Sequence, residues 1–401
     1  MIASNFIIRD PLLDPKLRVI GYHLAWQRNA LQGSTDAELE TLLGLLTSAL
    51  NDPVQGWLLG NKVLFLDAVP ALLSTNALHA LPPAYTVLCL SGDDLDNPDT
   101  RAAVHALRAG GIGISLHGFD LATSSQAALD CASHVEVRFS SADMAAQARA
   151  YAALKQASVQ IVGRALTTWA DFDACAALGL NVFAGKLHLT PRPGNKAVGM
   201  NPAQAVIVQL MQMVRQDADI DKIEGVLKRD AALSYKLLRF INSAGLGRGR
   251  EIASLRQALG VLGHAPLQRW LTLLLATASG NDAPVLMETA VVRGRLAELL
   301  GLAALGKSAA DDLFVAGMFS LLDRLLGLPM AQVLDKIDLS DDVVAALLDR
   351  SGIYGPYLAL AEACEIDANL AGALAGALKI SAQDVNLAHL AALAWAQSIG
   401  A

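Results

Sequence analysis

Short runs rich in β-branched and aromatic residues alternate with helix-like stretches between Arg18 and Thr190. Seven such runs stand out: Arg18–Ala25, Lys62–Leu66, Thr86–Leu90, Gly113–Leu116, His134–Phe139, Val159–Gly163 and Asn181–Phe183. Alternation of this kind is typical of parallel strands joined by helical crossovers, and this many repeats favours a closed barrel over an open sheet. The sequence therefore predicts an α/β barrel in this part of the chain.

The segment Thr190–Asn195 ends the alternation, because its two prolines and its glycine suit neither a helix nor a central strand. Beyond it the strand signals vanish, and apolar residues such as Val206, Leu210 and Val214 recur at helical spacing. The predicted fold class is thus α/β followed by all-α. We expect a barrel domain over residues 1–190, a linker over 191–200 and an all-helical domain over 201–401.

The composition is that of a folded protein, since hydrophobic residues make up 53% of the chain and charged residues 17%. The longest uncharged run, Ala68–Gly92, is broken by three prolines, so no membrane span is expected. The N-terminus lacks the pattern of a signal peptide, and we expect the protein to stay in the cytoplasm. A net charge of -7 argues against nucleic acid as a partner.

The four cysteines, Cys89, Cys131, Cys175 and Cys364, lie far apart and form no Cys-x-x-Cys pair. This spacing indicates neither a disulfide framework nor a thiolate zinc site. We therefore interpret all of them as small buried hydrophobic residues.

The second half contains a segment, Ile220–Ala244, that is similar to the signature of the HDOD family, as is its continuation Glu251–Ala258. The resemblance implies an all-helical fold like that of HD phosphohydrolases, without their His-Asp metal pair. Independently, no His-Asp dipeptide occurs in this chain, and the second half holds just His264 and His389. The signature residues that could serve either an interaction or the structure itself are Arg229, Asp230, Arg239, Asn242, Ser243 and Arg256.

The first half resembles EAL domains through the order of its seven strands, the stretch Gly111–Phe119 and the turn Leu178–Gly185. EAL domains are modified α/β barrels that hydrolyse cyclic di-GMP with divalent metals. The resemblance places the Glu-Ala-Leu tripeptide on His23-Leu24-Ala25 and a phosphate-binding arginine on Gln27. It places the remaining motif residues on Asp67, on positions near Cys89 and Gly92, on His117-Gly118, on Glu136 and Arg138, and on Gly163-Arg164-Ala165-Leu166.

Metal-assisted phosphodiester hydrolysis needs carboxylates that hold the ions, a base that activates water and cations that offset the developing charge. Nearly all of these residue types are replaced here, so we expect no catalytic residue, no metal and no cofactor. The remaining degenerate EAL pocket would consist of His23, Gln27, Asp67, His117, Glu136, Arg138 and Arg164. His23, Asp67 and His117 are ligand types that zinc accepts, but we interpret them as residues left after the site decayed.

The function predicted from these losses is that of a non-enzymatic regulatory protein acting through protein–protein interaction. Its partners would be other signalling proteins of unknown identity. We expect it neither to associate with a membrane nor to bind cyclic di-GMP. Homo-oligomer formation is left open. One alternative is a receptor that binds cyclic di-GMP or another nucleotide without turnover. A second alternative is a residual cyclic di-GMP phosphodiesterase.

Overall fold

A computed structural model describes most of the chain, namely residues 5–26, 36–118, 126–138, 144–157, 159–193, 201–243, 252, 254–277, 284–335, 337 and 339–400. The chain divides into two compact units. The barrel unit comprises residues 1–194, 282–292 and 359–401, and the helical unit comprises residues 195–281 and 293–358. The predicted domain bounds of 1–190, 191–200 and 201–401 stay a prediction.

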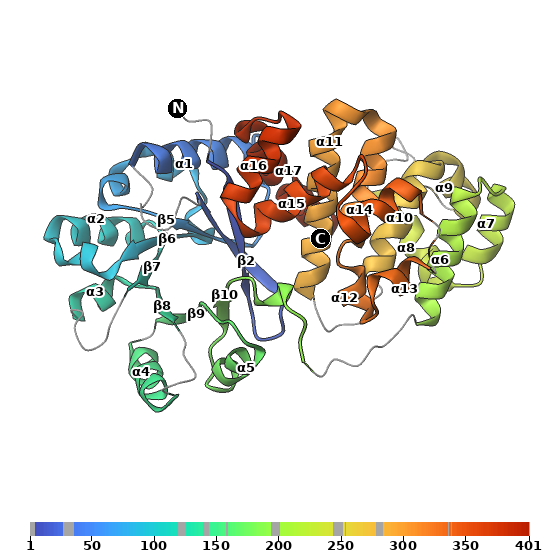
Figure 1. Ribbon diagram of the computed structural model, residues 1–401. Coiled ribbons are helices and arrows are strands. Elements are labelled where there is room, and N and C mark those ends of the chain that lie inside the picture. The colour runs from blue at the N-terminus through green and yellow to red at the C-terminus, as the bar shows by residue number, and fades with distance from the viewer. Residues whose placement is uncertain are drawn as a thin grey trace. The chain divides into compact units, whose positions relative to one another are not determined.

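The barrel unit contains a closed eight-stranded barrel with the strand order β1-β10-β9-β8-β7-β6-β5-β2 (Figure 1). Its strands are β1 (Ile7–Leu13), β2 (Val19–Trp26), β5 (Val63–Asp67), β6 (Thr86–Ser91), β7 (Gly113–His117), β8 (His134–Arg138), β9 (Gln160–Arg164) and β10 (Val182–Ala184). A separate two-stranded ribbon joins β3 (Asn51–Asp52) to β4 (Gly56–Trp57). The predicted barrel is confirmed, with all seven expected strands in place.

Strand β1 is the barrel strand that the sequence did not indicate, and it runs antiparallel to both of its neighbours, β2 and β10. The triplet Arg9-Asp10-Pro11 interrupts its apolar pattern. The Arg9 side chain is almost fully buried and forms an ion pair of 3.5 Å with Glu365. The side-chain oxygen of the buried Asn386 accepts a hydrogen bond of 2.8 Å from the backbone N–H of Ile7. Two residues from late in the chain therefore support this strand.

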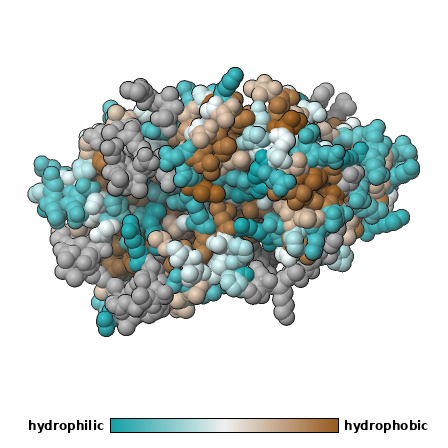
Figure 2. All heavy atoms as spheres, viewed as in Figure 1, coloured by the Kyte–Doolittle hydropathy of each residue, from teal (hydrophilic) through white to brown (hydrophobic). Residues whose placement is uncertain are grey.

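Helices and short 3-10 turns connect the parallel strands, and helices from the C-terminal region complete the unit. The helices are α1 (Asp36–Leu50), α2 (Pro98–Ala109), α3 (Gln126–Cys131), α4 (Met144–Gln156), α5 (Trp169–Ala177), α16 (Ala368–Leu378) and α17 (Ala382–Gly400). In α2, the side-chain oxygen of Asn97 caps the first turn by accepting from the Asp99 N–H, and Val104 and Leu107 face inward. Figure 2 shows hydrophilic residues over the outer surface of α2.

The barrel interior has an apolar lower layer that includes Leu12, Phe65, Val87, Val162 and Val182. Side chains two residues apart on a strand point to the same face of the sheet. The next inward positions toward the carboxyl ends of β5, β8 and β9 are therefore polar: Asp67, Glu136 and Arg164, respectively. This alternation places a polar layer directly above the apolar core.

The helical unit is built from helices alone among its described residues, as predicted. It contains α6 (Pro202–Arg215), α7 (Ile220–Leu227), α8 (Ala231–Ser243), α9 (Leu255–Leu262), α10 (His264–Thr277), α12 (Leu322–Leu326), α13 (Met330–Leu334) and α14 (Asp341–Asp349). Helices α11 (Pro284–Phe319) and α15 (Gly355–Ile366) contribute residues to both units. Within the described ranges, none of the helices combines the length and the apolar character that a membrane crossing requires.

Helix α11 is interrupted at Gly306, whose φ of 80° is outside the helical range, and its two parts pack together at two glycines. A Cβ on Gly317 would lie 2.5 Å from the Gly294 Cα and 2.7 Å from the Arg293 carbonyl oxygen. Both distances are far below van der Waals contact, and both neighbours are backbone atoms that cannot rotate away. The two parts of α11 therefore touch through their backbones.

Replacing Gly317→Ala should destabilise the helical unit by about 1–3 kcal/mol, because the added methyl group forces the two parts of α11 apart. Gly225→Ala in α7 is the matched control, since a Cβ there meets nothing within 4 Å. That control should leave stability unchanged or raise it by up to about 1 kcal/mol through helix propensity. Urea unfolding of the two full-length variants measures the difference, and equal midpoints would contradict the packing described.

Stability should fall as the pH falls from about 6.5 toward 3 because of His389, whose pKa burial lowers from 6.5 to about 3. In that window the unfolded chain binds a proton on this ring and the folded chain does not, so acid favours unfolding. The single proton sets a slope of up to about 1.4 kcal/mol per pH unit. In His389→Leu this contribution disappears, and parallel stability–pH curves for the variant and the wild type would refute the assignment.

Candidate functional site at the barrel mouth

The polar layer lies at the carboxyl ends of the parallel strands, the end at which barrel enzymes carry their reacting groups. Asp67, His117, Arg138 and Arg164 are the last residues of β5, β7, β8 and β9. The register of the sheet sets Asp67 beside Cys89 of β6. Side chains from several strands therefore converge at this mouth.

His23 and Asp67 form the central contact of the mouth, with 2.8 Å between His23 Nε2 and Asp67 Oδ1. Arg164 Nη1 lies 3.3 Å from the other ring nitrogen, Nδ1. A guanidinium is purely a donor, so Nδ1 accepts and the ring proton sits on Nε2, where it is donated to the carboxylate. Burial alone would raise the pKa of Asp67, but His23 and Arg164 hold that pKa below its usual range.

Glu136 and Arg164 form an ion pair on the neighbouring strands β8 and β9. Arg164 Nε lies 2.6 Å from Glu136 Oε2, and Arg164 Nη2 donates to Oε1 at 2.9 Å. The hydroxyl of Ser115 donates to the same Oε1 at 3.1 Å. Burial alone would lower the pKa of Arg164, but the adjacent Glu136 carboxylate raises it, so the guanidinium stays charged.

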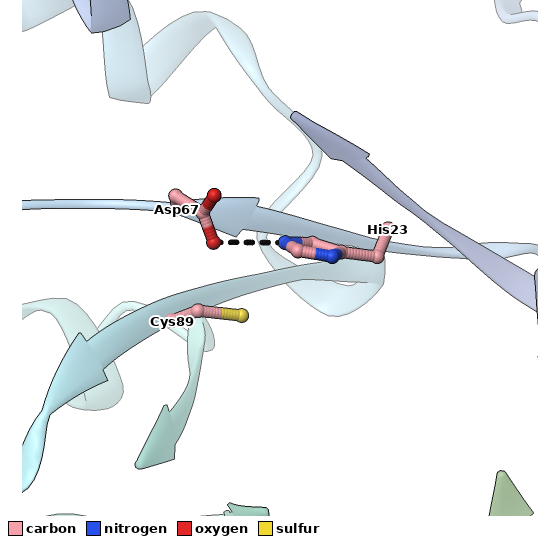
Figure 3. A group of neighbouring side chains, drawn as sticks. All are labelled: His23, Asp67 and Cys89. Carbon is pink, nitrogen blue, oxygen red and sulfur yellow. Dashed lines mark hydrogen bonds and ion pairs between the residues drawn. The ribbon is translucent and has the colours of Figure 1, made fainter. Parts of the chain in front are cut away.

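Cys89 belongs to the apolar core of the barrel and borders the polar layer at His23 and Asp67, and Figure 3 shows the three side chains gathered together. One ligand atom from each residue lies within 4.8 Å of the other two. Burial, followed by the nearby Glu136 and Asp67 carboxylates, raises the pKa of the Cys89 thiol well above its usual value. The group thus offers one imidazole nitrogen, one carboxylate oxygen and one sulfur.

The hard divalent metals implied by the EAL resemblance prefer oxygen ligands, and several carboxylates are needed to hold two of them. Three carboxylates lie on β1, β5 and β8. Asp10 pairs with Lys186 at 3.3 Å, Glu136 pairs with Arg164, and Asp67 bonds to His23. A pair of hard ions would have to break these contacts, so the residues present do not fit such a pair.

The structure brings together four of the residues singled out in the sequence, namely His23, Asp67, Glu136 and Arg164. His117 and Arg138 end their strands with exposed side chains, and Gln27 lies outside the described residues. All four cysteines are free and buried, as predicted, and Cys89 belongs to the apolar core of the barrel. The sequence did not indicate that Cys89 also lies next to His23 and Asp67. The one available signal was its place in the EAL resemblance, where a carboxylate is expected.

The HDOD signature residues that can be described serve helix ends and surface ion pairs. Asp230 Oδ1 accepts from the backbone N–H groups of Ala232 at 2.9 Å and Leu233 at 3.0 Å, and thereby caps α8. Arg256 pairs with Asp221 and lies 3.3 Å from Glu224. The Arg229 side chain is exposed, and those of Arg239, Asn242 and Ser243 lie outside the described residues. An interaction role for this set stays a prediction.

The comparisons with known proteins agree with this architecture. The family model "HDOD domain" matches residues 200–335. The chain is 25% identical over 405 residues to "Cyclic di-GMP phosphodiesterase CdgJ" of Vibrio cholerae serotype O1. The matched region comprises 99% of this chain and 93% of the relative. The uncharacterized protein YuxH of Bacillus subtilis is 21% identical over 374 residues, 90% of each chain.

Among solved structures, the barrel is similar to the PaMucR phosphodiesterase in complex with c-di-GMP. The identity is 19% and the TM-score 0.37, over 48% of this chain and 93% of that one. The EAL domain of Mycobacterium smegmatis DcpA matches with 17% identity and a TM-score of 0.38, over 45% of this chain and 90% of that one. Values this low carry no information about what the present barrel binds.

The Vibrio relative contradicts the prediction of a non-enzymatic interaction protein, because a chain alike over nearly its whole length is named a phosphodiesterase. That prediction is wrong, and so is the expectation that cyclic di-GMP is no ligand. The physical reason is that the prediction considered only whether the carboxylates of the EAL motif are present. Other side chains at the same strand ends, including His23 and Cys89, offer nitrogen and sulfur atoms with chemistry of their own.

Both predicted halves are thereby confirmed at the level of the fold. The chain joins an N-terminal eight-stranded barrel that resembles EAL domains to a C-terminal region that carries an HDOD domain.

Proposed function

We propose that the barrel mouth hydrolyses a phosphodiester bond of cyclic di-GMP. The observation that carries this proposal is the convergence of His23, Asp67, Glu136 and Arg164 at the carboxyl ends of the parallel strands. The substrate class is supported by the likeness to a phosphodiesterase across 99% of this chain.

Phosphodiester hydrolysis needs positive charge near the phosphate and a group that moves a proton. Arg138 ends β8 with an exposed side chain, and we assign it to the phosphate. Arg164 is a weaker candidate for that role, because Glu136 already neutralises its charge. The charge on Arg164 instead holds the His23 ring and the Glu136 carboxylate in place.

His117 is assigned to the proton transfer. It ends β7 at the same mouth with an exposed side chain, and it is close enough to Asp67 to help lower the pKa of that carboxyl. A histidine changes charge near neutral pH more readily than any other side chain. Its exposure also means that the ring can be removed without leaving a cavity in the core.

His117→Ala should lower the rate of cyclic di-GMP hydrolysis at least about a hundredfold, which is the usual effect of removing a proton-transfer group. The measurement is the appearance of the linear dinucleotide by chromatography, with full-length protein and magnesium, manganese or zinc added in turn. His79→Ala is the matched control, because His79 is also an exposed histidine but lies on the turn Asn76–Ala80.

The control should retain wild-type activity. If the wild-type chain forms no linear dinucleotide with any of the three ions, the proposed function fails. If His117→Ala and His79→Ala are equally active, hydrolysis stands but the assignment of His117 does not.

A further inference from the structure

We propose that His23, Asp67 and Cys89 bind one borderline divalent ion of the zinc class, in place of a pair of hard ions. The three residues lie on β2, β5 and β6, which are consecutive in the barrel order. The imidazole and the carboxylate are joined by a hydrogen bond of 2.8 Å. Figure 3 shows this bond with the Cys89 side chain beside it. This inference deepens the proposed function, although the binding of the ion requires these three side chains alone.

The mixture of donor atoms is the first argument for a zinc-class ion. Zinc accepts imidazole nitrogen, carboxylate oxygen and thiolate sulfur together, whereas magnesium and calcium are held by oxygen. Zinc bond lengths of about 2.0–2.3 Å imply ligand atoms about 3.5 Å apart around a tetrahedral ion. A spacing of up to 4.8 Å would have to close by about 1.3 Å around such an ion, and the 2.8 Å contact between His23 and Asp67 would have to widen by about 0.7 Å.

The side chains have room for that closure. Asp67 keeps 45% of its side-chain surface exposed, so its carboxylate can turn at the mouth. Coordination through His23 Nε2 moves the ring proton to Nδ1, and Arg164 must then give up its 3.3 Å contact with that nitrogen. Arg164 retains its two contacts with Glu136, which already hold it on the far side of the ring.

The net charge of the side chains at the barrel mouth is the second argument, and it favours one divalent ion over two. With Cys89 bound as a thiolate, the negative groups are Asp67, Cys89 and Glu136, and Arg164 offsets one of them. The Asp10 carboxylate is offset by Lys186. One divalent ion neutralises what remains, whereas a second would leave uncompensated positive charge in a largely buried layer.

Three protein ligands with an open fourth position are the arrangement of catalytic rather than structural zinc sites. An ion held in this way lowers the pKa of a bound water molecule and makes it a nucleophile near neutral pH. The exposed edge of Asp67 leaves the open position on the side of the mouth.

The test uses the full-length protein, stripped with a chelator and dialysed against zinc or cobalt, with bound metal counted by mass spectrometry. We expect one ion per chain, and in the cobalt form a thiolate-to-cobalt charge-transfer absorption. Cys89→Ser should abolish that absorption and weaken zinc binding by more than the roughly 10–100-fold that loss of an outer-shell partner costs.

Cys131→Ser is the matched control, because Cys131 is equally buried but contacts His105 on α2 instead of the mouth. It should retain both the ion and the absorption. Circular dichroism of both variants separates loss of the site from loss of the fold, and Asp67→Asn provides a second variant should Cys89→Ser unfold.

The proposal is overturned if the folded wild type holds no zinc, if it holds two ions per chain, or if Cys89→Ser keeps the cobalt absorption. The outcome is separable from that of the proposed function. Zinc bound at Cys89 without hydrolysis would sink the phosphodiesterase assignment alone, and hydrolysis supported by magnesium without zinc binding would sink this inference alone.

Discussion

The two-residue period of the barrel strands is the constraint on which the rest of the site depends. Phe65 and Val87 point into the barrel core, so Asp67 and Cys89, two positions further along the same strands, must point inward as well. The lower layer excludes water because it is apolar, and the layer above faces the mouth. The charged pair Glu136–Arg164 is tolerated there because each partner satisfies the other and Ser115 adds a further hydrogen bond.

Closure of the barrel depends in turn on residues far along the chain. Strand β1 separates β2 from β10, and its first residues are bound by Asn386 of α17. Truncating that amide would leave a buried backbone N–H without its acceptor, a loss of about 1–3 kcal/mol. The buried Arg9 likewise requires Glu365. The barrel unit therefore includes residues 359–401, which follow the helical unit in the sequence. The position of His23 on β2 depends on these residues, because they hold the neighbouring strand β1.

Much of this fold follows from local sequence pattern, and the exceptions have identifiable causes. The seven predicted strands coincide with short β-branched runs, and α6 covers the residues Val206, Leu210 and Val214 that recur at helical spacing. Strand β1 escaped notice because Arg9 and Pro11 break its pattern, and their compensation comes from residues distant in sequence. Similarly, Asp221 lies in the first turn of α7, and its carboxylate pairs with Arg256, a residue 35 positions further along the chain. These pairing partners are determined by the tertiary structure, and a local stretch of sequence does not indicate them.

The candidate site shows the same limit in its chemistry. Comparing each strand end with a known motif identifies the acids that are missing, but it does not identify which replacements meet in space. His23 and Cys89 are 66 positions apart in the printed sequence, and nothing in their local surroundings marks them as neighbours. Parallel register sets Cys89 beside Asp67 and His23 beside Phe65, and the His23 ring reaches forward to the Asp67 carboxylate at 2.8 Å. A donor set of nitrogen, oxygen and sulfur differs in ion preference from a set of carboxylates, so exchange of the motif residues changes which ion the mouth can hold.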